Sequence, residues 1–92
     1  MRVTEKQLQG VVDRINEATK SPMTSYTKTK AGKFSANIGN FHLDFAYGGV
    51  ALHRMQSKGG GIEDIFGGHY PKRELFNRCW AYLDGIQLGN KK

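Results

Sequence analysis

Apolar residues in the first twenty positions recur at intervals of three and four. This spacing gathers them on one stripe of a helix, which we place over residues 4–19. Thr4 and Gln7 have the spacing of a capping box, in which the Thr hydroxyl accepts a hydrogen bond from an unpaired backbone N–H. Ser21 and Pro22 end the helix, because a proline disfavours helical backbone at the residue before it. The stripe consists of Leu8, Val11, Val12, Ile15 and Ala18.

Between residues 24 and 57 the pattern changes to alternation, which is typical of β-strands. Turn residues at 30–33, 39–40 and 47–49 divide this segment into four strands. We therefore predict an antiparallel meander whose first strand, 24–30, is polar and lies at an edge. The apolar face of the other strands consists of Phe34, Ala36, Ile38, Phe41, Leu43, Phe45, Val50 and Leu52. The opposite face consists of Ser35, Asn37, His42, Asp44, Ala51, His53 and Met55.

The last third of the chain predicts a loop followed by a second helix. Residues 57–70 form a glycine-rich connection, in which we expect one helical turn at 62–66. Pro71 begins the helix, since its missing N–H is no loss in a first turn. Gly85 is a candidate end, with one further ordered turn as far as Leu88. The apolar stripe of this helix consists of Leu75, Phe76, Cys79, Trp80, Leu83 and Ile86.

Two amphipathic helices and a sheet with one apolar face predict a single α+β domain over residues 1–92. In this prediction the N-terminal and C-terminal helices pack on one face of the four-stranded antiparallel meander sheet, and the other face stays uncovered. The predicted core consists of Val11, Ile15, Phe34, Ile38, Phe41, Leu43, Phe45, Leu52, Leu75, Cys79, Trp80 and Leu83.

Composition indicates the cellular compartment in which this domain is expected to work. The longest strictly apolar run, residues 79–83, is far shorter than the roughly 20 residues that span a bilayer. The first ten residues lack the apolar core of a signal peptide. A single cysteine, Cys79, excludes an internal disulfide. We therefore expect a protein of the reducing cytoplasm with no membrane contact.

Charge gives the first indication of a partner. Fourteen Lys and Arg against eight Asp and Glu give a net charge of +6, which attracts polyanions such as nucleic acid. Asp44 is the only acid between residues 20 and 58, and that segment holds six cations. The predicted nucleic-acid-binding residues are Lys28, Lys30, Lys33, Arg54 and Lys58, with a second patch at Arg73 and Arg78.

Two alternatives remain open for these residues. The positive charge also keeps a small protein soluble, and lysines on an edge strand prevent edge-to-edge aggregation. Tyr26, Tyr47 and Tyr70 are candidate surfaces for stacking on unpaired bases, and ordinary packing at the rim of the sheet explains them equally well.

Signals for catalysis are weak. The glycine triplet 59–61 lacks the lysine and hydroxyl that follow the glycines of a phosphate-binding loop. His42, His53 and His69 are too few for a structural zinc site, and Cys79 lies on the apolar stripe, where its thiolate is disfavoured. We expect no enzyme activity, no metal or other cofactor, and no small-molecule substrate.

Three longer stretches carry a more specific resemblance, which covers about residues 14–86. RINEATKSP, NIGNFHLDFAYGGVALHRM and GGGIEDIFGGHYPKRELFNRCWAYLDGI resemble small proteins encoded by tailed phages. Together with the length and the basic charge, they also resemble phage anti-CRISPR proteins of the type I-F class.

The resemblance implies a target and a compartment. The target is the type I-F surveillance complex, in which Cas proteins surround a CRISPR RNA, in the cytoplasm of the infected bacterial host. The implied function is inhibition by blocking the pairing of guide RNA with target DNA. No residue role carries over from the family. The alternative is a phage accessory protein that binds free RNA or DNA.

Overall fold

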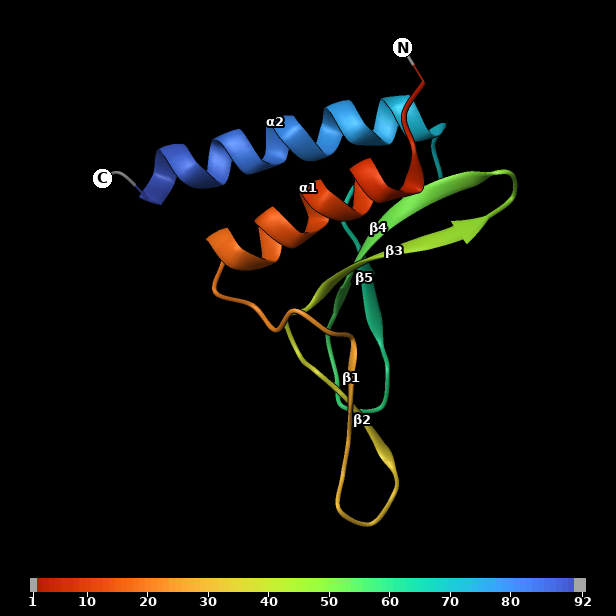
Figure 1. The fold of residues 1–92 in the computed structure, drawn as a ribbon, viewed down its shortest axis with the longest axis vertical. Coiled ribbons are helices and arrows are strands. Elements are labelled where there is room, and N and C mark those ends of the chain that lie inside the picture. The colour runs from red at the N-terminus through yellow and green to blue at the C-terminus, as the bar shows by residue number, and fades with distance from the viewer. Residues whose placement is uncertain (1, 91–92) are drawn as a thin grey trace.

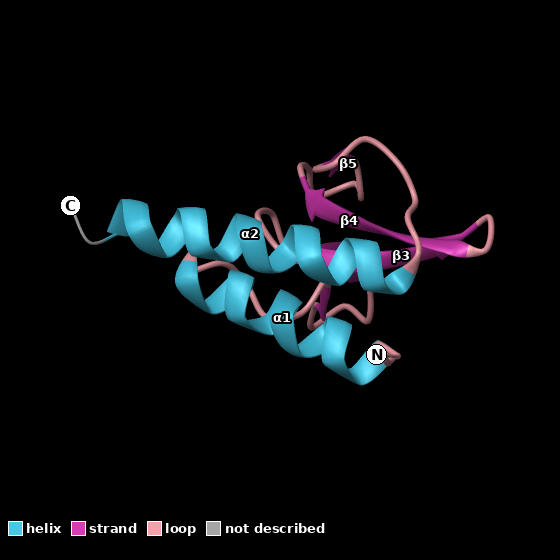
Figure 2. Cartoon of the chain, turned by 90° about the horizontal axis from the view of Figure 1, so that it is seen from above, coloured by secondary structure: helices cyan, strands magenta, loops and turns pink. Residues whose placement is uncertain are grey.

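The computed structural model describes residues 2–90 as two helices and five short strands. The two helices run side by side in the same direction and form one layer, which covers one face of the longest strand pair (Figures 1 and 2). The elements, in chain order, are α1 (Glu5–Ala18), β1 (Tyr26–Lys28), β2 (Phe34–Ala36), β3 (Phe41–Ala46), β4 (Gly49–Met55), β5 (Ile62–Asp64) and α2 (Lys72–Asn90).

The ends of the helices follow local sequence chemistry in two cases and depart from it in one. The Thr4 hydroxyl accepts from the Gln7 backbone N–H, and the Gln7 side chain accepts from the Thr4 N–H, so the predicted capping box is confirmed. α2 begins directly after Pro71, as predicted. α2 does not end at the candidate Gly85 but continues through the further turn expected as far as Leu88 and reaches Asn90. One exposed glycine costs a helix only about 1 kcal/mol, and the partly buried Ile86 packs against the core beyond it.

The single four-stranded meander is also wrong. β1 pairs only with β2, while β3, β4 and β5 form a separate antiparallel sheet. The predicted turn at residues 39–40 is present, with Gly39 at a φ of +95°, but β2 does not pair with β3 across it. The buried Asn40 holds this turn, since its side chain bonds the Pro22 carbonyl at 2.7 Å and the Ser25 hydroxyl at 2.9 Å.

Residues 62–64, where one helical turn was expected, instead form β5 against β4. The chain then follows the same edge of β4 further, with Ile65 N donating to the Leu52 carbonyl and Tyr70 exchanging two hydrogen bonds with Val50. β4 is therefore a central strand. Ala51 and Met55, which were predicted on the open face, are both buried.

The core lies between the helices and the β3–β4 pair. Phe34, Ile38 and Phe45 were predicted to be core residues, but their exposed fractions are 70%, 53% and 50%. The helices do not cover β1 and β2, which project beyond them (Figure 1). Leu43 and Trp80 are only partly buried. The core consists of Val3, Leu8, Val11, Val12, Ile15, Phe41, Val50, Leu52, Leu75, Cys79 and Leu83.

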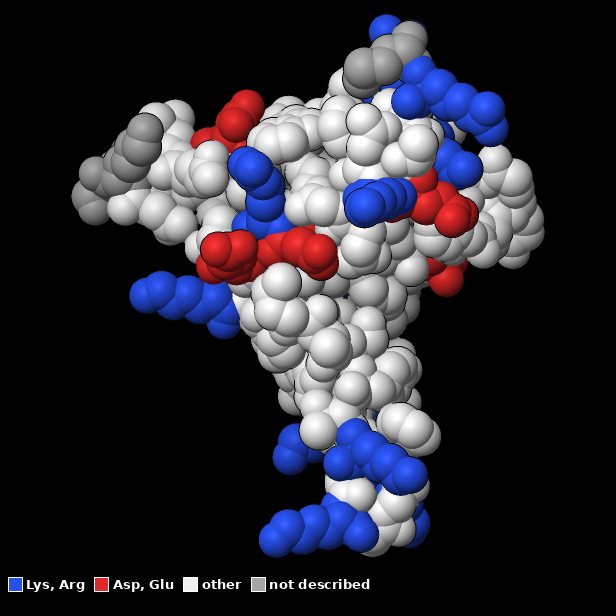
Figure 3. Space-filling model, in the orientation of Figure 1, with Lys and Arg blue, Asp and Glu red and all other residues white. Residues whose placement is uncertain are grey.

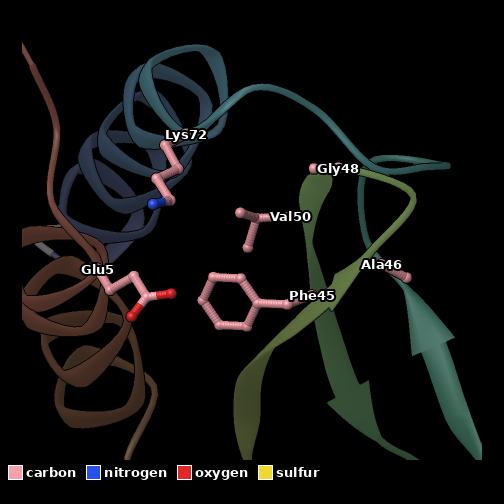
Figure 4. Close-up of a pocket in the computed structure, with 7 residues that line it drawn as sticks. Glu5, Phe45, Ala46, Gly48, Val50 and Lys72 are labelled. Carbon is pink, nitrogen blue, oxygen red and sulfur yellow. The ribbon is translucent and has the colours of Figure 1, made fainter.

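Phe45 lies at the opposite end of the sheet from β1 and β2. Its ring points into a shallow hollow of about 360 Å³ between the first turns of α1 and α2 (Figure 4). Glu5 and Lys72 flank this hollow, and Val50 lies beside the ring. The prediction placed this ring in the apolar core. In the structure it borders an open hollow lined by charged side chains, and it is therefore half exposed.

A buried amide joins the helical layer to the sheet. Asn16 is fully buried on the apolar stripe of α1. Its Nδ2 donates to the Phe41 carbonyl at 3.0 Å, and its Oδ1 accepts from the Phe41 N–H at 2.8 Å. Phe41 begins strand β3, whose outer edge no other strand pairs. Asn16 thus satisfies two backbone groups that would otherwise be buried without partners.

Candidate nucleic-acid interface

The β1–β2 hairpin, residues 26–36, projects from the body of the protein and carries three lysines and no acid. We call this segment the basic arm. Lys28, Lys30 and Lys33 are all exposed on it, and the sequence holds no Asp or Glu between Glu17 and Asp44. Figure 3 shows Lys and Arg but no Asp or Glu on the projecting end of this face, while acidic side chains lie on the body. The arm therefore presents positive charge that no acid on it offsets, and such a surface attracts a polyanion.

The tip of the basic arm is an ordered turn. Thr29 N donates to the Lys33 carbonyl at 2.6 Å, and Gly32 N donates to the Thr29 carbonyl at 2.9 Å. Gly32 has a φ of +81°, which glycine adopts without steric strain. The predicted turn at residues 30–33 is thus confirmed. Its geometry places two lysines, Lys30 and Lys33, at the tip of the arm.

The base of the arm is tied to the body by side-chain amides and by the turn between β4 and β5. Asn37 Nδ2 donates to the Thr24 carbonyl and to the Thr27 hydroxyl, both at 2.9 Å. Ala36 N donates to the Lys58 carbonyl at 3.4 Å. The exposed Lys58 therefore lies on the turn that adjoins the base of the arm.

The strand register decides which side chains share a face of the arm. Lys28 is opposite Phe34, and Tyr26 is opposite Ala36. Residues opposite each other, and residues two apart on one strand, point to the same side of a sheet. One face therefore carries Tyr26, Lys28, Phe34 and Ala36. Ala36 is buried at the base, whereas the two aromatic rings are 50% and 70% exposed.

Arg54 was predicted to bind nucleic acid, but its guanidinium is already engaged within the fold. Arg54 is opposite Phe41 in the register, on the side of the sheet that faces the helices. Its Nε donates to the Gly39 carbonyl at 3.1 Å, and its guanidinium carbon lies 4.6 Å from the centre of the Phe41 ring. These contacts hold the turn between β2 and β3, so Arg54 does not join the basic arm.

The second predicted patch lies on α2, apart from the arm (Figure 1). Arg73 is exposed near the start of the helix. Arg78 is engaged twice, since its Nε lies 3.4 Å from a Glu74 carboxylate oxygen and its guanidinium carbon lies 4.2 Å from the centre of the Tyr70 ring. The sequence therefore predicted two patches, and only the first gathers several unpaired cations among residues 2–90.

A row of aromatic rings lies on the side of the β3–β4 pair that faces away from the helices. His42 and His53 are opposite each other in the register, with ring centres 5.9 Å apart, and His69 lies 6.2 Å from His53. His69 Nε2 is 2.8 Å from an Asp44 carboxylate oxygen. Tyr47 completes the row, 5.4 Å from His69.

The charges of this row are coupled. Partial burial, and then the neighbouring His53, lower the pKa of His42. The hydrogen bond to His69 lowers the pKa of Asp44. Within residues 2–90, no group of three or more His, Cys, Asp or Glu side chains is arranged to hold a metal ion. Burial also raises the pKa of Cys79 to about 12, which disfavours its thiolate.

Sequence reasoning missed one residue of the arm. Phe34 was assigned to the core because it alternates with Ala36 and Ile38. The opposing strand offered a contrary signal, since residues 24–30 contain Tyr26 as their only apolar side chain. A hairpin with one polar strand has too little apolar surface to be buried as a layer of the core. Its remaining aromatic residues are therefore exposed.

Comparison with known proteins gives no relative from which a function could be assigned. No family model matches the chain, and no curated protein or solved structure is significantly similar to it. Among residues 2–90, no helix combines the length and the apolar character needed to cross a membrane.

Proposed function

We propose that this protein binds nucleic acid through its basic arm and acts as an inhibitor of a nucleic-acid-guided complex. The observation that carries the proposal is the arm itself, in which Lys28, Lys30 and Lys33 are exposed and the sequence from 18 to 43 holds no acid. Lys58 lies on the turn that adjoins the base of the arm. Each lysine that contacts a phosphate releases condensed counterions. A cluster of lysines therefore supplies most of the free energy with which a protein binds a polyanion without sequence preference.

The sequence resemblance to type I-F anti-CRISPR proteins supplies the setting. In that setting the arm contacts the CRISPR RNA of the surveillance complex, and the body contacts Cas subunits. The described residues extend only 45 Å along their longest axis, so the protein covers part of a guide. That is sufficient, because pairing begins in a seed of roughly 8–12 nucleotides and extends from there. The expected result is a complex that no longer captures target DNA.

The same arm also supports the alternative, an accessory protein that acts on free RNA or DNA. Lysine–phosphate contacts require no Cas subunit. Affinity for the assembled complex compared with affinity for the isolated CRISPR RNA separates the two. An inhibitor of the complex binds the complex more tightly and abolishes the shift of labelled target DNA. An accessory protein binds the free strand equally well and leaves target capture intact.

The proposal is tested by removing charge from the arm. The double variant Lys30→Gln/Lys33→Gln is compared with Lys6→Gln/Lys72→Gln, which loses the same charge from exposed positions on the two helices. Binding of a labelled RNA is measured as a function of salt concentration. If both arm lysines contact phosphates of a single strand, the slope of log K against log salt falls by about 1.4 for the arm variant. Identical slopes for the two double variants would refute a role for the arm.

A further inference from the structure

Two aromatic rings on the basic arm are largely exposed. Phe34 is 70% exposed, although phenylalanine usually lies inside, and Tyr26 is 50% exposed. Neither ring makes an aromatic pair within residues 2–90, where six such pairs occur elsewhere. Because the register places both rings on one face, they form an apolar patch rimmed by polar residues, and larger patches of this kind mark interaction sites.

The position of these rings relative to charge indicates what the partner is. Phe34 is directly opposite Lys28, and Tyr26 lies diagonally across the hairpin on the same face. Lys33 is next to Phe34 in the chain, and the turn that bears Lys58 adjoins Tyr26 through Gly60. Aromatic rings among lysines, with no acid nearby in sequence, match a strand whose bases stack on the rings and whose phosphates meet the cations.

We infer that the arm selects single-stranded nucleic acid, with Phe34 stacking on an unpaired base and Lys28 contacting an adjacent phosphate. Tyr26 provides the second stacking surface. In a duplex, the base faces are covered by neighbouring base pairs, so these rings gain nothing there. This inference rests on the proposed function and names the substrate class of the same site. It also gives a role to Phe34, which is the most exposed aromatic residue of the two strands and lies opposite Lys28.

The test uses three oligonucleotides of equal length: a single strand, the corresponding duplex, and a single strand in which the bases are replaced by abasic sites. Fluorescence anisotropy gives the affinity of the full protein for each. The wild-type protein is expected to prefer the normal single strand over both others by about 5- to 160-fold, the range that corresponds to one stacked base. Equal affinity for all three would overturn the inference, since phosphate contacts alone would then account for binding.

Variants place the preference on the ring. Phe34→Leu keeps an apolar side chain and removes the aromatic face, while Phe34→Trp keeps it. Phe45→Leu is the matched control, because Phe45 is also a half-exposed phenyl group but lies at the other end of the sheet. Only Phe34→Leu is expected to lose the single-strand preference. If Phe34→Leu and Phe45→Leu bind alike, Phe34 is not the stacking residue and the inference fails.

The outcome also distinguishes the inference from the proposed function. If the Lys30→Gln/Lys33→Gln variant loses affinity and Phe34→Leu does not, the arm binds nucleic acid through phosphates alone. If neither variant loses affinity for any of the oligonucleotides, the proposed function itself fails. The abasic strand requires no mutation, so the test stands even if a variant were unstable.

Discussion

The two hydrogen bonds of Asn16 give a prediction whose size follows from the structure. Asn16→Ala leaves the Phe41 N–H and carbonyl without partners in a site where both residues are at most 1% exposed. Each lost bond costs about 0.5–1.5 kcal/mol, and each buried group left unpaired costs about 1–3 kcal/mol. Because the small cavity admits some relaxation, we expect a loss of about 2–5 kcal/mol of unfolding free energy. For a chain of this size that lowers the melting temperature by roughly 10–30 °C.

Urea unfolding followed by circular dichroism measures this loss, and Asn37→Ala is the control. Asn37 also loses side-chain hydrogen bonds, to Thr24 and Thr27, but at an exposed site where water replaces the protein partner. We expect it to cost about 1 kcal/mol or less. A cost for Asn16→Ala that matches the cost for Asn37→Ala would show that α1 does not hold the edge of β3 as described. The urea dependence of the free energy should stay unchanged, since the surface exposed on unfolding is the same.

Three further predictions concern packing, pH and thiol reactivity. Phe41→Ala should cost about 3–5 kcal/mol in urea unfolding, and Phe45→Ala about half of that or less, because Phe41 is 1% exposed and Phe45 is 50% exposed; equal costs would contradict the register of β3. Folding lowers the pKa of His42, so the unfolded chain binds more protons at this residue and the protein loses stability as the pH falls below about 6.5. His42→Gln should therefore flatten the dependence of unfolding free energy on pH between pH 7 and 5. An unchanged dependence would contradict this. Cys79, whose pKa burial raises to about 12, should react with a thiol reagent at pH 8 only after denaturation; rapid labelling of the folded protein would mean that α2 opens readily.

The sequence predicted those parts of the fold that depend on local chemistry. The capping box at Thr4, the start of α2 after Pro71 and the turn at Gly32 are each set by residues within a few positions of one another, and all three are confirmed. The pairing of strands depends instead on side chains far apart in the chain. Asn40 breaks the meander by bonding Pro22 and Ser25, and no periodicity reveals such a contact.

The residues of the candidate site were also predicted in part, where their environment depends on local sequence. Charge density along the chain selected Lys28, Lys30 and Lys33 on the hairpin and Lys58 on the turn after β4, and all four are exposed in the structure. It also selected Arg54, whose guanidinium the structure places over the Phe41 ring. Alternation alone could not separate a strand in the core from a strand in a projecting arm, since both show the same period of two. Phe34 was therefore assigned to the wrong environment.

The parallel packing of α1 and α2 joins the first and last elements of the chain, and this has a consequence for synthesis in the cell. The apolar stripe of α1, including Val11, is made before α2, and it is fully covered only once Leu75, Cys79 and Leu83 have been added, because α2 packs on it beside β3. Until then the nascent chain exposes a helix surface on which aggregation can begin. Contacts between chain ends also slow folding, because the whole intervening chain must be ordered as they form. Resistance of nascent chains to protease should accordingly appear in one step, when α2 becomes available, and not gradually as each strand is made.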